Sequence, residues 1–176
     1  MRARPTTASV ERALTWGADE NLLLACSAAG WISARVIRSH LRPTTNHILL
    51  VTAAAAIVPH ILKGIFDQVR PDRTAVRGHL HGIPLSGKSL DAFPSGHAVH
   101  MGALASAASV LPWRYRLLAW SLATGISGTR IAILAHWLSD VIAGFVIGVA
   151  IERALRRMTG YPDPQLRCIL FPGRKL

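Results

Sequence analysis

Three short polar segments, each at the end of an apolar stretch, hold the side chains that could do chemistry. They cover residues 63–71, 94–97 and 129–140. Between them they supply three permanent cations, a serine beside a glycine, two histidines, and a carboxylate four residues after one of those histidines. Such side chains can bind a phosphate group, and a histidine among them can act as nucleophile or base.

The three cations are Lys63, Arg70 and Arg130. An unpaired cation in or near a membrane is costly, so three cations brought to one pocket imply an anionic ligand. The arginine fork and the lysine point charge both match the oxygens of phosphate. We therefore expect these three side chains to hold a phosphate.

The run Pro94-Ser95-Gly96-His97 precedes an apolar stretch and predicts the N-terminus of a helix. Free backbone amides and the positive end of the helix dipole favour an anion there. Ser95 could cap this helix or donate to the phosphate. Gly96 would let a phosphoryl oxygen approach the backbone, because glycine has no side chain.

His136 and Asp140 are four residues apart, so on one helix they would share a face. The carboxylate could then hold one ring nitrogen and leave the lone pair of the other nitrogen exposed. This is the arrangement of an activated nucleophile or base. Gly144 and Gly148 continue the same face, and close helix packing is the favoured interpretation of both.

Five apolar stretches must position these segments, and they predict an all-α protein. They are too apolar on all sides for amphipathic surface helices, although several are shorter than the usual span of about 20 residues. We predict an integral membrane helical bundle of about five or six short transmembrane helices, with a soluble all-α core as the alternative. The stretches cover residues 21–37, 47–66, 97–111, 117–135 and 136–151.

The composition excludes several other classes of protein. The chain combines a formal charge of +11 with 51% hydrophobic residues, which argues against disorder. Cys26 and Cys168 stand far apart with no CxxC pair, which argues against a disulfide scaffold or a thiolate metal site. A basic protein could bind nucleic acid, but aromatic residues do not interleave with the basic ones, so we expect no nucleic-acid partner.

Loop charges predict how the bundle lies in the cell membrane. Eleven cations would share one side, which the positive-inside tendency makes cytoplasmic. They are Arg35, Arg38, Arg42, Arg114, Arg116, Arg153, Arg156, Arg157, Arg167, Arg174 and Lys175. The three polar segments then face the periplasm or the exterior. We divide the chain into an N-terminal segment that could form an interfacial helix (1–20), a transmembrane core (21–151) and a basic cytoplasmic tail (152–176).

Taken in order, Lys-x6-Arg-Pro, Pro-Ser-Gly-His and Arg-x5-His-x3-Asp resemble the three signature motifs of the type 2 phosphatidic acid phosphatase superfamily. They run from Lys63 to Asp140, a little under half of the chain. The third motif usually begins Ser-Arg and here begins Thr129-Arg130, which keeps a hydroxyl. Membrane members commonly have six spans, whereas we count five apolar stretches.

The resemblance implies a lipid phosphatase that needs neither metal nor cofactor and works through a phosphohistidine. It makes His136 the nucleophile and has Asp140 orient it. His97 would protonate the leaving oxygen and then take a proton from water. The phosphoryl oxygens would be held by Lys63, Arg70, Ser95, Gly96 and Arg130.

Several alternatives stay open. The substrate could be a polyprenyl diphosphate, phosphatidic acid, phosphatidylglycerol phosphate or a phosphorylated saccharide lipid, bound among membrane lipids. A non-catalytic membrane protein that binds or transports anionic lipid would use the same pocket. The sequence assigns no role to the tail or to four further histidines, which are His60, His79, His81 and His100.

Overall fold

The computed structural model describes residues 20–37, 40–69, 71, 92–162, 166, 168 and 170. Nearly all of the predicted N-terminal segment, together with Arg70, His79 and His81, lies outside these ranges. The described residues form five α-helices and one short 3₁₀ helix, with no strand among them, as the all-α prediction requires. The elements are α2 (Glu20–Val36), α3 (Arg42–Lys63), α5 (Gly96–Ala107), η1 (Ala108–Val110), α6 (Trp113–Ala132) and α7 (Leu138–Thr159).

Each predicted apolar stretch contains a helix, but the helices do not end where the stretches end. α3 begins at Arg42 with Pro43 in its first turn, where the missing N–H costs no helical hydrogen bond. α7 continues past Ile151, where the predicted tail begins, as far as Thr159. It stops because Gly160 adopts the left-handed conformation (φ 69°), and its N–H donates to the carbonyl of Arg156.

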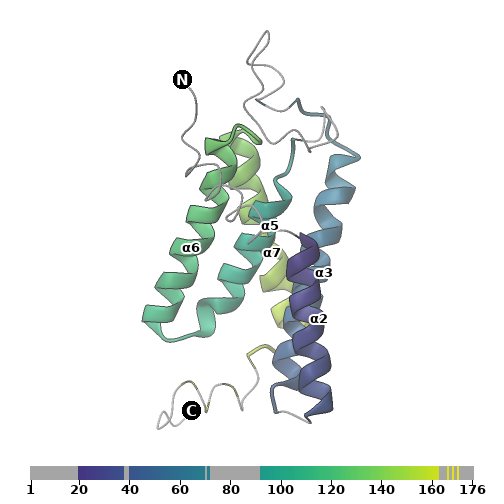
Figure 1. The fold of residues 1–176 in the computed structure, drawn as a ribbon, viewed down its shortest axis with the longest axis vertical. Helices are drawn as coiled ribbons and strands as arrows, with labels where there is room; N and C mark the ends of the chain where they lie inside the picture. The colour runs from purple at the N-terminus through teal and green to yellow at the C-terminus, as the bar shows by residue number, and fades with distance from the viewer. Residues whose placement is uncertain are drawn as a thin grey trace, which may run out of the picture.

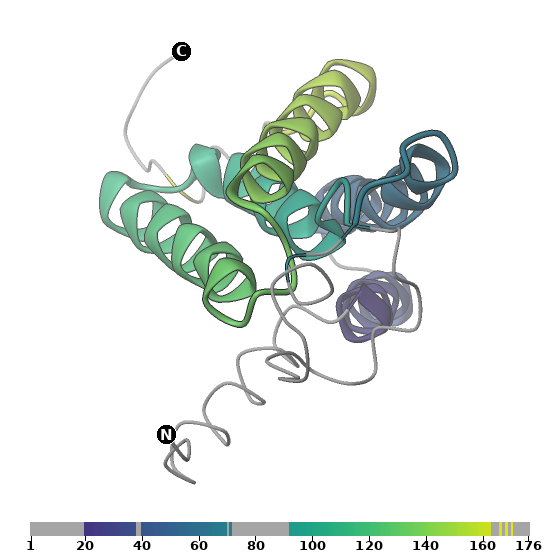
Figure 2. The same ribbon diagram turned by 90° about the horizontal axis from the view of Figure 1, so that it is seen from above.

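The helix α5 is the centre of the bundle. It packs mainly against α7 and also contacts α6 and α3, while α2 packs chiefly on α3. Figure 1 shows the helices along the long axis, and Figure 2 shows α5 between α6 and α3. Most residues of α5 are buried, because its small apolar side chains allow neighbours to approach from several sides.

Three glycines allow α5 and α7 to approach one another closely. A Cβ added at Gly144 would lie 2.7 Å from the carbonyl oxygen of Ser95, and one at Gly148 would collide with the carbonyl of Val99. On the other side, a Cβ at Gly102 would collide with the backbone of Phe145. The packing interpretation of Gly144 and Gly148 is therefore confirmed.

Many large apolar side chains point away from the protein. Leu118 and Leu122 on α6, and Ile142 and Val146 on α7, are all more than half exposed. Among the described helices one, α3, is long and apolar enough to cross a membrane by length and composition. The helices α2 and α5 are shorter, with 17 and 12 residues, and α6 and α7 carry several charges.

A buried polar cluster joins α3, α5 and α7 at the end where α7 finishes. We call His47, Ser106, Glu152 and Arg156 the far-end network. The carboxylate of Glu152 is fully buried and accepts from Ser106 Oγ (2.5 Å), Arg156 Nε (2.8 Å) and His47 Nε2 (3.2 Å). His47 and Ser106 come from distant parts of the chain, whereas Arg156 lies one turn further along α7. The charged residues beyond Ile151 are therefore part of the helical bundle.

Tyr161 covers the far-end network. Its ring stacks on the imidazole of His47 with centroids 4.2 Å apart, and its hydroxyl donates to the carbonyl of Ala107. Burial raises the pKa of the Tyr161 phenol, which keeps the hydroxyl protonated as a donor.

Candidate active site

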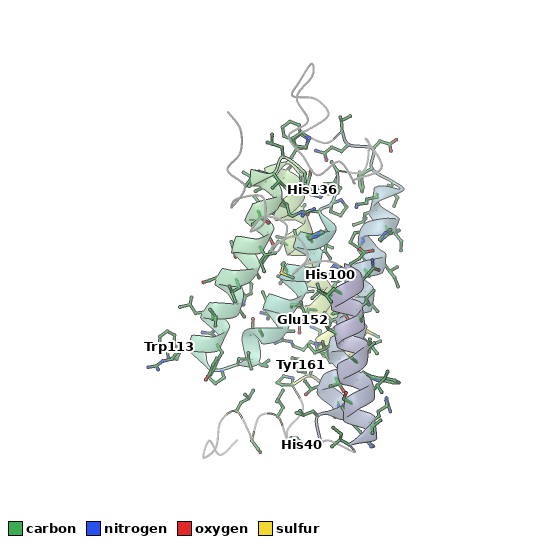
Figure 3. All side chains as sticks on the ribbon, in the orientation of Figure 1. His40, His100, Trp113, His136, Glu152 and Tyr161 are labelled. Carbon is green, nitrogen blue, oxygen red and sulfur yellow. The ribbon has the colours of Figure 1, made fainter. Side chains whose placement is uncertain are left out.

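The three polar segments meet at the end of the bundle opposite the far-end network. Figure 3 shows His136 near one end, with Glu152 and Tyr161 toward the other. Hydrogen bonds join the segments: Ala92 N to Gln68 O (3.0 Å), Trp137 Nε1 to Val69 O (2.8 Å) and Ser95 N to Asp140 O (3.2 Å). Residues separated by up to 68 positions in the sequence are thereby brought together.

His136 lies in the loop before α7, two residues ahead of the helix on which the sequence analysis placed it. Its backbone N–H donates to the carbonyl of Arg130 (3.3 Å), which also accepts from Ala135 (3.1 Å). Leu134 adopts a left-handed conformation (φ 57°) at this turn. The end of α6 thus holds the backbone at His136 and at the residue before it.

The imidazole of His136 is almost fully buried, and its orientation is held by a main-chain group. Its Nδ1 lies 2.6 Å from the carbonyl oxygen of Ala92, which can only accept a hydrogen bond. Nδ1 therefore carries a proton, and in the neutral imidazole Nε2 carries the lone pair. Sequence analysis missed Ala92, since every residue has such a carbonyl.

The carboxylate of Asp140 acts as a helix cap more than as the partner that orients His136. Its nearest carboxylate oxygen lies 3.9 Å from Nδ1 of His136, beyond hydrogen-bond length but within reach of an electrostatic interaction. The same oxygen accepts from the backbone N–H of Trp137 (2.9 Å), and Ser139 Oγ approaches the other at 3.3 Å. The fully buried carboxylate thus fixes the start of α7.

The N-terminus of α5 lies against α7 as expected, although Ser95 is not a side-chain cap. Ser95 is fully buried at the N-cap position, and its hydroxyl makes no hydrogen bond with any described residue. A Cβ added at Gly96 would meet only the Cβ of Pro59, at an ordinary 3.9 Å. The described part of the chain therefore leaves room for a small group at Gly96.

The structure describes two of the three predicted cations. Arg130 is buried (8% exposed) in the last turn of α6, and Lys63 is the half-buried last residue of α3. Arg70 lies outside the described residues. The hydroxyl of Thr129, in the third segment, donates to the carbonyl of Ile126 (2.6 Å) and so stays within α6.

The remaining described histidines have different surroundings. His97 is partly buried in the first turn of α5, next to Gly96. His100 is fully buried, with Nδ1 3.1 Å from the carbonyl of Gly96. His60 is exposed on α3, and its Nε2 lies 3.8 Å from a carboxylate oxygen of Glu20. No group of histidine, cysteine and carboxylate side chains among the described residues could hold a metal ion.

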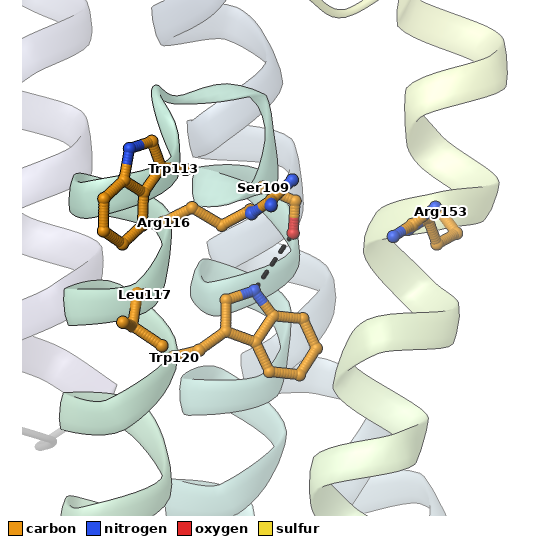
Figure 4. Close-up of a pocket in the computed structure, with 6 residues that line it drawn as sticks. All are labelled: Ser109, Trp113, Arg116, Leu117, Trp120 and Arg153. Carbon is orange, nitrogen blue, oxygen red and sulfur yellow. Dashed lines mark hydrogen bonds between the residues drawn. The ribbon is translucent and has the colours of Figure 1, made fainter.

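A cavity of about 380 Å³ at the opposite end does not offer the same chemistry. The described residues that line it include two arginines and two tryptophans but no histidine or carboxylate, and Trp120 Nε1 donates to Ser109 Oγ at 3.1 Å (Figure 4). Its lining residues are Ser109, Trp113, Arg116, Leu117, Trp120 and Arg153.

Comparison with known proteins agrees with this geometry. The sequence profile of the PAP2 superfamily matches residues 44–163, which include all three polar segments. A lipid A 1-phosphatase from Rhizobium johnstonii is 33% identical over 103 residues, which are 58% of this chain and 42% of that protein. A second lipid A 1-phosphatase, from Rhizobium etli, is 32% identical over 103 residues, 58% of this chain and 44% of that protein. The chain thus spans less than half the length of these curated relatives, and no solved structure matches it.

Proposed function

The chain belongs to the PAP2 superfamily, and on that premise we propose that it is a metal-independent phosphatase of a membrane lipid phosphate. The observation that carries the proposal is the orientation of His136. Because Ala92 accepts from Nδ1, the lone pair on Nε2 is available to attack phosphorus. Arg130 and the N-terminus of α5 lie around the same loop and can hold an anion.

The reaction would proceed in two displacements. Nε2 of His136 attacks phosphorus, the bond from phosphorus to the lipid oxygen breaks, and His97 gives that oxygen a proton. A phosphohistidine remains. Water then attacks phosphorus, His97 takes its proton, and the bond from phosphorus to Nε2 breaks to release inorganic phosphate and restore both histidines.

The other residues would stabilise charge. Arg130, Lys63 and Arg70 hold the phosphoryl oxygens, together with Ser95 Oγ and the backbone N–H groups at Gly96. The carboxylate of Asp140 stabilises the positive charge that develops on His136 from 3.9 Å away. No step requires a metal or a cofactor.

We propose a phosphorylated saccharide lipid as the substrate, cleaved at the phosphate on its sugar. Both relatives described above are lipid A 1-phosphatases, which favours this class over polyprenyl diphosphate, phosphatidic acid and phosphatidylglycerol phosphate. A saccharide carries the phosphate at the membrane surface, where the loop with His136 would lie.

We further propose that the bundle lies in the cell membrane with this site on the non-cytoplasmic face. α3 can cross a bilayer, and exposed leucine, isoleucine and valine side chains on α6 and α7 would face lipid. Arg35, Arg42 and Arg114 lie at helix ends opposite His136, which supports a cytoplasmic location for that end.

The test is phosphate release by the detergent-purified chain in EDTA from a panel of the four lipid classes. We expect release from the saccharide lipid phosphate by the unmodified chain and none by His136→Ala. A requirement for a divalent metal, or equal activity in the variant, would overturn the proposal. Lipid binding without release by either protein would instead identify an anionic-lipid-binding or transport protein.

A further inference from the structure

A groove between α6 and α7 begins beside the candidate active site and is lined almost entirely by apolar atoms. Its volume is about 290 Å³. On α6 it extends from Thr124 to Ile131, which is about 10 Å along the helix axis. The lining residues are Thr124, Ser127, Gly128, Ile131, Leu138, Val141, Ile142, Phe145 and Val146.

One end of the groove reaches the loop that carries His136. Ile131 directly follows the phosphate-binding candidate Arg130, and Leu138 stands two residues after His136. This end of the groove therefore lies at the same end of the bundle as the candidate phosphate site. The polar loop at this end and the apolar groove beyond it follow the order of a lipid phosphate, headgroup first and hydrocarbon after.

The groove exists because α6 and α7 both pack on α5 and contact each other much less. Phe145 of α7 fills the space behind it, with its ring 5.7 Å from that of Trp120. At Gly128 no atom of the described residues lies within 4 Å of where a Cβ would be, so among them the groove is open at this position. Leu138, Ile142 and Val146 form an exposed apolar wall.

We propose that this groove holds a hydrocarbon chain of the same lipid whose phosphate binds beside His136. The inference rests on the proposed function. It adds a position for one hydrocarbon chain of the substrate. Apolar surface on the chain and on the wall would be buried together, so binding should strengthen as the chain grows along the groove. Gly128 is then a determinant of chain-length preference.

The test compares two leucine substitutions on one helix. Gly128→Leu places a side chain in the groove, whereas Gly125→Leu, nearly one turn earlier, also meets open space but does not line the groove. Both exchanges raise helix propensity equally. The probes are butyl phosphate and dodecyl phosphate, which share a headgroup and differ in chain length.

We expect the unmodified chain to prefer dodecyl phosphate, and Gly128→Leu to lower the ratio of the two kcat/KM values about tenfold through KM. Gly125→Leu should retain the ratio within about twofold, and melting temperatures should show that both variants fold. The groove assignment fails if Gly128→Leu keeps the preference, if both variants lose it equally, or if butyl phosphate is hydrolysed as well as dodecyl phosphate. Absence of hydrolysis of both probes and of the lipid panel would instead refute the phosphatase itself, and the inference with it.

Discussion

Ala92 and His136 are 44 residues apart in the chain, yet the carbonyl oxygen of Ala92 lies 2.6 Å from Nδ1 of His136. A main-chain acceptor therefore sets the tautomer of the proposed nucleophile. Substitution of a side chain cannot remove this acceptor directly. The role left for Asp140 is to cap α7 and to supply negative charge near the imidazole.

The exchange Asp140→Asn tests that division of roles. Asparagine keeps an oxygen to accept from Trp137 but loses the charge, and it cannot invert the tautomer that Ala92 sets. We expect kcat to fall by much less than the roughly 10⁴-fold loss that follows when a carboxylate sets the tautomer. Steady-state kinetics beside His136→Ala decide this, and a loss as large as that of His136→Ala would restore Asp140 as the orienting group.

Removal of the His97 imidazole should lower the hydrolysis rate more for a substrate with a poorer leaving group. His97→Ala should slow release from a lipid phosphate by about 10²–10⁴-fold, because an alkoxide must then leave without a proton. The loss should be far smaller with p-nitrophenyl phosphate, whose leaving group needs no proton. Equal losses with both substrates would argue against His97 as the acid.

The same assignment predicts a maximum in the pH dependence of the rate. Hydrolysis requires a protonated His97 and a neutral His136 at the start of the reaction, so the rate should fall on both sides of a maximum between mildly acidic and neutral pH. A kcat profile over a wide pH range measures this. A rate that continues to climb above about pH 9 would contradict the assignment.

Gly96→Ala tests whether the absence of a side chain at this position is required for phosphate binding or for folding. The added methyl group would lie 3.9 Å from Pro59 and disturb no protein contact, so the melting temperature should be retained. If a phosphoryl oxygen approaches this backbone, KM should rise about tenfold or more. Gly30→Ala on α2, which also meets open space, is the matched control. Unchanged kinetics would remove Gly96 from the phosphate site.

Loss of the carboxylate from the far-end network should destabilise the protein, although this carboxylate has no part in the proposed reaction. Glu152→Ala would leave the buried His47 and Ser106 and the partly buried Arg156 without their shared acceptor, which should cost about 3–5 kcal/mol of unfolding free energy. Unfolding by denaturant in detergent measures this, with Glu20→Gln as the control at a partly exposed carboxylate. A change below about 1 kcal/mol would show that the network contributes little.

The sequence allows prediction of the helices and of which polar segments come together. It does not allow prediction of the hydrogen bonds that arrange these segments around His136. The apolar stretches can be recognised from residue types alone. The same holds for the spacing of Arg130, His136 and Asp140. The acceptor at Ala92 is not visible, because a carbonyl is common to all residues. The position of His136 ahead of α7 follows from hydrogen bonds to Arg130 that no periodicity reveals.

The sequence pattern also fails to predict where α7 ends, for a different reason. A hydropathy pattern ends at the first charges, so Glu152 and Arg156 were placed in a tail. In the fold Glu152 and Arg156 form an ion pair, and the carboxylate of Glu152 also accepts hydrogen bonds from partners on α3 and α5 that are far away in the sequence. Burial of a charge depends on such partners, and a single stretch of sequence does not contain them.

The glycine contacts between α5 and α7 join these two helices into one closely packed unit of the bundle. α5 and α7 interlock through Gly102, Gly144 and Gly148, so the helix N-terminus at Ser95 and the start of α7 must move as one body. α6 touches α7 lightly and is joined to it by the loop that carries His136. A substitution that pushed α5 and α7 apart would therefore move Ser95 relative to Asp140, so the arrangement of the polar segments depends on three glycines that lie outside those segments.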